Sequence, residues 1–224
     1  MNINRIFILG DSFSANGSNF LINESEKHAF WVDMLTDTFN IKKYAEESRD
    51  IQTILDIWIK LLPQITENDC IVVGFPFFSR WRLPRHKDDY KQENELIIRH
   101  IGQNAYSECK IETVERNGIN ERLSENEIIN SSIASTLNTK EIIESLTQLS
   151  KCKVILWSWV RFKEGFKPNG LYDKTDLENE LGYWGTQDDI YYKTKKKYGR
   201  IGDLHWDETT QKLFFEFIKN KIEQ

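Results

Sequence analysis

The chain has 224 residues, of which 39% are hydrophobic and 29% charged, so it can form a packed core and is not a disordered chain. Its 30 basic and 35 acidic side chains give a formal net charge of −5, which provides no overall positive field for nucleic acid or an anionic membrane surface. The chain has three cysteines, an odd number, and they show no CxxC spacing; they are Cys70, Cys109 and Cys152. This argues against a disulfide framework or a cysteine-rich zinc site.

Apolar patterning predicts an alternation of strands and helices. The predicted strands are Ile6–Leu9, Cys70–Phe75 and Lys153–Trp159. The predicted helices are Ala29–Phe39, Ile51–Leu62, Lys87–Gln103, Glu125–Leu149 and Thr209–Ile222. Because strands and helices alternate, we expect a parallel sheet with helices on both faces, which is a three-layer α/β/α sandwich.

The whole chain, residues 1–224, is predicted to form a single domain, because its length suits one α/β unit and no linker-like segment interrupts it. One long stretch departs from the alternation of strands and helices. Residues from about 160 to 202 are rich in Gly, Tyr, Asp and Lys, and we expect them to form an irregular insertion within the domain.

The apolar run at the start of the chain is too short for the core of a signal peptide, and no A-x-A-like cleavage site follows it. Elsewhere, no stretch approaches the ~18 apolar residues of a membrane-spanning helix. We therefore expect a soluble protein of the cytoplasm that has no membrane partner.

Residues of nucleophilic catalysis follow the first predicted strand and precede the last predicted helix. Open parallel sheets carry their sites at the carboxyl ends of their strands. Ser12 comes directly after the first strand, whereas Asp203 and His205 come just before the terminal helix. A serine is a poor nucleophile until a histidine takes its proton, and an acid must orient that histidine. The sequence therefore offers Ser12, His205 and Asp203 as a catalytic triad.

Each of these residues also has a structural interpretation. Ser12 suits the N-cap of a helix, since serine is preferred there. Asp11 is interpreted as a structural residue that closes the turn before Ser12. Four tryptophans fit either core packing or the lining of a carbohydrate cleft; they are Trp157, Trp159, Trp184 and Trp206.

The loop after the second predicted strand holds a group of arginines beside Trp81. This group fits either a solvated basic loop or a site for a charged or sugar substrate, and Arg80 is the candidate substrate-binding residue. No HExxH motif and no cluster of His and Cys is present, so we predict no metal ligands and no cofactor.

The segment Phe7–Ser14, FILGDSFS, resembles the first block of the SGNH, or GDSL-type, hydrolases, in which the serine of Gly-Asp-Ser is the nucleophile. The segment Asp203–Trp206, ahead of the terminal helix, is similar to the last block of that family. The two blocks stand at the two ends of the chain in the family's order. The resemblance implies a flavodoxin-like α/β/α fold with Ser12 as nucleophile, His205 as general base and Asp203 as the orienting acid.

In two oxyanion-hole blocks, this sequence departs from the family's usual pattern. The glycine of the second block has no counterpart in residues 45–50, so the backbone N–H of Ser48 is the candidate donor beside that of Ser12. The asparagine of the third block is absent after Gly74. The family's acid usually stands three residues before the histidine, where this chain has Gly202, although the Asp-x-His-Trp order is similar to a branch that acts on polysaccharide acyl groups.

The resemblance implies a serine-dependent ester hydrolase acting on a small-molecule or carbohydrate ester, with O-acyl or O-acetyl groups on a carbohydrate as candidate substrates. Two alternatives stay open. One is an O-acyltransferase, which passes the acyl group to a sugar hydroxyl. The other is a catalytically weak protein of the same fold that binds a glycan or a partner. The sequence does not indicate the oligomeric state.

Overall fold

The computed structural model describes most of the sheet and its helices. It describes residues 3–11, 14, 30–45, 51–76, 80–82, 98–100, 125–162, 165–184, 206 and 208–224, with backbone alone for 80–82, 98–100 and 125–136.

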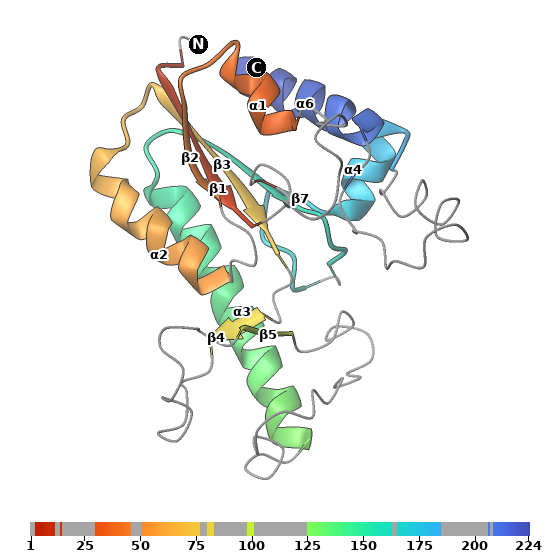
Figure 1. Cartoon of the computed structure of the whole chain (residues 1–224). Coiled ribbons are helices and arrows are strands. Elements are labelled where there is room, and N and C mark those ends of the chain that lie inside the picture. The colour runs from red at the N-terminus through yellow and green to blue at the C-terminus, as the bar shows by residue number, and fades with distance from the viewer. Residues whose placement is uncertain are drawn as a thin grey trace, which may run out of the picture.

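A five-stranded sheet forms the centre of the fold, in the order β2-β1-β3-β6-β7 (Figure 1). All of its neighbouring strands pair in parallel. The strands are β1 (Arg5–Gly10), β2 (Ile41–Ala45), β3 (Asp69–Phe75), β6 (Lys153–Ser158) and β7 (Leu171–Tyr172). The three strands expected from the sequence are therefore confirmed as β1, β3 and β6. The edge strands β2 and β7 complete the sheet.

Helices cover both faces of the sheet, as Figure 1 shows. They are α1 (Trp31–Thr36), α2 (Ile51–Leu61), α3 (Glu125–Leu149), α4 (Lys174–Leu181) and α6 (Glu208–Glu223). A short 3₁₀ turn, η2 (Leu62–Gln64), follows α2. Of the expected helices, four are confirmed within a few residues at each end.

Alternate side chains of each strand point into two separate cores. From β1, Ile6 and Ile8 pack under α1, α4 and α6. Phe7 and Leu9 pack against α2 and α3 on the opposite face. Because β1 and β3 are buried on both faces, they read as continuous apolar runs, which is typical of parallel sheets. The predicted three-layer α/β/α architecture is confirmed.

Part of the expected helix Lys87–Gln103 is instead a strand. A second, two-stranded sheet pairs β4 (Arg80–Arg82) with β5 (Ile98–His100) in antiparallel fashion, with Arg80 opposite His100. The run Leu96-Ile97-Ile98 is continuous and rich in β-branched side chains, which favours a strand. The residues before 98 in this segment lie outside the described part of the chain.

The segment expected to be irregular contains regular structure at its centre. β7 pairs with β6, and α4 follows directly. The Asp173 carboxylate accepts hydrogen bonds from the backbone N–H groups of Thr175 and Asp176, and the Asp176 side chain accepts from the N–H of Asp173, which is a capping box. Gly182, at φ +66°, ends the helix. Residues 185–205 are not described, and a single domain over the whole chain stays a prediction.

An ion pair joins the amino ends of β1 and β3. Nε and Nη2 of Arg5 donate to the two carboxylate oxygens of Asp69, at 2.9 and 2.7 Å. The two residues are also partners in the strand register. The hydrogen bond from Arg5 holds the pKa of the buried Asp69 carboxyl below its usual value. No helix among the described residues is long and apolar enough to cross a membrane.

Candidate active site

The strand order creates a switch point at the carboxyl ends of β1 and β3. From β1 the chain continues to its neighbour β2 on one side, whereas from β3 it continues to β6 on the other side. In doubly wound sheets of this flavodoxin-like order, ligands bind in the crevice outside these strand ends. The residues at this edge are Gly10 and Asp11 after β1, and Gly74, Phe75 and Pro76 at the end of β3.

A tight turn follows β1 and runs from Asp11 to Ser14, whereas the sequence interpretation places Asp11 at the close of a turn before Ser12. The backbone N–H of Ser14 donates to the carbonyl oxygen of Asp11 at 2.9 Å, the i to i+3 bond of such a turn. Both residues are fully buried. The Asp11 carboxylate also accepts a hydrogen bond from the indole Nε1 of Trp159, at 3.2 Å. The turn is therefore anchored through both its backbone and a side chain.

Glycines let this turn approach β3 closely. A Cβ on Gly10 would lie 2.4 Å from Oγ of Ser14, and a Cβ on Gly74 would lie 2.6 Å from the same atom. The Gly74 Cβ would also lie 2.5 Å from Cζ2 of Trp157, at the end of β6. A Cβ atom essentially never has non-bonded contacts this short, so the packing here depends on the absence of both side chains.

Trp157 also packs against one residue just before α6 and one residue on α6. Its ring centroid lies 5.3 Å from that of Trp206 and 4.6 Å from that of Phe214 on α6. Trp184 in turn lies 4.8 Å from Trp206. Trp157 and Trp206 are buried, so these two have the core-packing role, whereas Trp159 and Trp184 are only partly buried.

Two buried polar atoms at this edge have no hydrogen-bond partner within the described part of the chain. They are Oγ of Ser14 and Nε1 of Trp157. A fully buried serine hydroxyl is closed to substrate. Ser14 is therefore excluded as a nucleophile, although it belongs to the same Gly-Asp-Ser-Phe-Ser motif as Ser12.

The residues predicted to perform the chemistry lie outside the described residues. These are Ser12, Ser48, Asp203 and His205. Arg80 is described by its backbone alone, in β4.

The chain neighbours of the predicted triad are nevertheless described. Asp11 and Ser14, which flank Ser12 in the sequence, form the turn after β1. Trp206, which follows His205, packs against Trp157 at the end of β6. The described residues that adjoin the two motifs are thus brought to one edge of the sheet, while the geometry of the triad itself stays a prediction.

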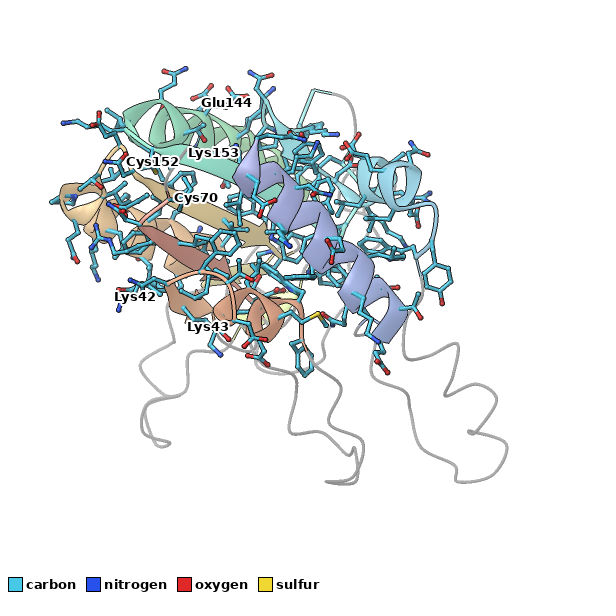
Figure 2. The ribbon with its side chains drawn as sticks, turned by 90° about the horizontal axis from the view of Figure 1, so that it is seen from above. Lys42, Lys43, Cys70, Glu144, Cys152 and Lys153 are labelled. Atoms are coloured by element: carbon cyan, nitrogen blue, oxygen red, sulfur yellow. The ribbon has the colours of Figure 1, made fainter. Side chains whose placement is uncertain are left out.

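The two described cysteines lie at the opposite edge of the sheet. Cys70 is near the start of β3, paired in register with Lys153, and Cys152 comes just before β6 (Figure 2). Burial raises the pKa of the Cys70 thiol to about 12 and that of the Cys152 thiol to about 11. Both thiols are therefore protonated near neutral pH, and neither is a nucleophile for this site.

Among the residues that the structure describes, no three His, Cys, Asp or Glu side chains gather as a metal site would require. The two described cysteines belong to the amino ends of the strands, so neither contributes a sulfur ligand to the edge at the switch point.

No family model and no curated protein matches this chain. Several solved structures are similar to it, among them two whose match covers almost all of this chain. A member of the lipolytic protein G-D-S-L family from Veillonella parvula DSM 2008 has 10% sequence identity and a TM-score of 0.40, and the match covers 96% of each chain. The protein YxiM of Bacillus subtilis has 15% identity and a TM-score of 0.45, over 98% of this chain and 57% of that chain. The first carries the family description that the motifs of this sequence resemble.

The contact at Gly74 generates a stability prediction. Gly74→Ala places a methyl group within 2.6 Å of both Trp157 and Ser14, so we expect the free energy of unfolding to fall by about 1–3 kcal/mol. Urea denaturation of the folded variant measures this loss. In a Trp157→Phe background, which lacks the Cζ2 atom, Gly74→Ala should cost less; equal costs in both backgrounds would contradict the contact.

Proposed function

We propose that this protein is a serine-dependent ester hydrolase whose site lies at the carboxyl ends of β1, β3 and β6. The observation that carries the proposal is the convergence of two motif-bearing segments at the switch point. The turn that contains Asp11 and Ser14 packs against Gly74, and Trp206 packs on Trp157, whose ring lies against the same glycine. The Gly-Asp-Ser and Asp-x-His motifs adjoin these anchored residues in the sequence.

In the proposed mechanism, Ser12 Oγ attacks the carbonyl carbon of the ester while His205 takes its proton. His205 then protonates the leaving alkoxide, which departs as the alcohol, and an acyl-enzyme remains. Water, deprotonated by the same histidine, hydrolyses the acyl-enzyme and restores Ser12. Asp203 accepts a hydrogen bond from the other ring nitrogen, which selects the tautomer that faces the serine.

The oxyanion of each tetrahedral intermediate needs hydrogen-bond donors. The proposal assigns this role to the backbone N–H groups of Ser12 and Ser48. Pro76 stands two residues after Gly74, where the family pattern has an asparagine, and it has neither a side-chain donor nor an N–H group. Because one oxyanion donor is worth roughly 10²–10³ in rate, turnover on simple esters should be slow.

The proposed substrate is an ester of a carbohydrate or a small molecule, with an O-acetyl group as the leading candidate and Arg80 as a contact for a charged or sugar part. Acyl transfer to a sugar hydroxyl uses the same acyl-enzyme and is favoured where the site excludes water. Because Pro76 supplies no oxyanion donor, a second candidate function is supported. In it, the protein is weakly catalytic or inactive and binds a glycan or a partner.

Labelling with a fluorophosphonate probe tests the nucleophile and separates these functions. We expect the wild-type chain to be labelled at Ser12 and Ser12→Ala to be unlabelled, with turnover of p-nitrophenyl acetate reduced by orders of magnitude. Ser14→Ala is the matched control. This variant should still be labelled at Ser12, because the Ser14 hydroxyl that it lacks is buried in the wild-type chain. Labelling that persists in Ser12→Ala would place the nucleophile elsewhere, and an unlabelled wild-type chain would favour the binding function.

The role of Asp203 is tested by Asp203→Asn. An asparagine in this place favours the wrong histidine tautomer, so we expect kcat on p-nitrophenyl acetate to fall by up to roughly 10⁴, with an unchanged circular dichroism spectrum. A nearly silent substitution would instead indicate a Ser12–His205 dyad whose ring is oriented by a backbone carbonyl.

A further inference from the structure

We propose that Trp159 is a positioning residue for the hydrolase, because it holds Asp11, which begins the turn to Ser14 and directly precedes the proposed nucleophile Ser12 in the chain. Its indole Nε1 donates to Oδ2 of Asp11 at 3.2 Å. Trp159 follows β6 and Asp11 follows β1, and β3 lies between these two strands in the sheet. The hydrogen bond therefore spans the carboxyl end of β3, at the switch point where the site is proposed. This inference rests on the proposed function.

The donor stands on a fixed part of the backbone. Ser158, the last residue of β6, donates from Oγ to the carbonyl oxygen of Phe75 at 3.0 Å. The same Oγ accepts from the backbone N–H of Val160 at 3.2 Å. Trp159 lies between Ser158 and Val160, so its backbone is tied on both sides to the end of β3. A donor held in this way restrains its acceptor.

The acceptor transmits this restraint toward the nucleophile. The Asp11 side chain is fully buried, and a hydrogen bond to a carboxylate is stronger than one between neutral groups. The carbonyl oxygen of Asp11 also accepts the N–H of Ser14, which closes the turn. Ser12 follows Asp11 directly in the chain. A shift of Asp11 thus moves the backbone that carries the proposed nucleophile, and a misplacement of 1 Å costs about 10²-fold in rate.

Trp159→Phe tests the inference, because it removes the indole N–H and keeps an aromatic ring. Trp58→Phe is the matched control, since Nε1 of Trp58 donates to Oγ of Ser150 at 3.0 Å in the core under α2 and α3. We expect Trp159→Phe to lower kcat for p-nitrophenyl acetate by about 10²-fold with KM nearly unchanged, and to slow fluorophosphonate labelling in parallel. Trp58→Phe should leave kcat, KM and the labelling rate unchanged, although it too loses a hydrogen bond.

A double-mutant cycle with Asp11→Ala tests whether Trp159 acts through Asp11. Once the acceptor is removed, Trp159→Phe should lower kcat no further. A full additional loss in that background would overturn the inference, and so would a Trp159→Phe protein that behaves like Trp58→Phe. If Asp11→Ala does not fold, the comparison of the two tryptophan variants decides alone. A wild-type chain with neither labelling nor turnover would overturn the proposed function itself.

Discussion

The absence of two side chains, at Gly10 and Gly74, is the constraint on which the arrangement of this fold's carboxyl edge depends. The space that their Cβ atoms would occupy is taken by Oγ of Ser14 and by the ring of Trp157. β1, β3 and β6 can therefore end together with their following segments in contact. A methyl group at either glycine would separate the turn after β1 from the strand beside it. The close packing at the switch point would then be lost.

The two ends of the sheet are stabilised by different interactions. At the amino ends of β1 and β3, the Arg5–Asp69 ion pair joins two register partners, and the hydrogen bond from Thr66 N–H holds the Asp69 carboxylate in place. At the carboxyl ends, the described contacts include close packing of Gly74 against the indole of Trp157. Trp157 extends this packing to Trp206 and α6, so the last helix of the chain is fastened to the edge that also carries the first turn. The amino ends thus have a structural role, and the proposed chemistry belongs to the carboxyl ends.

Burial on both faces explains why the central strands could be predicted and the edge strands could not. β1, β3 and β6 read as apolar runs because helices cover both of their faces. β2 carries the exposed Lys42 and Lys43, labelled in Figure 2, so its sequence resembles a loop. β7 has only two residues, which no periodicity can reveal. The motif serine was predicted from sequence, whereas the Trp159–Asp11 bond joins residues 148 positions apart and leaves no local pattern.

The burial of Ser14 supports the proposal that Ser12 is the nucleophile, because the motif contains two serines that composition alone does not distinguish. A nucleophile needs a hydroxyl that reaches both the substrate and a base. Oγ of Ser14 lies within the packing between Gly10 and Gly74, and no described residue accepts its proton. The described thiols of Cys70 and Cys152 are protonated near neutral pH and lie at the other edge of the sheet. Within the Gly-Asp-Ser-Phe-Ser motif, Ser14 therefore contributes the packing on which the turn rests, and nucleophilic attack stays the proposed role of Ser12.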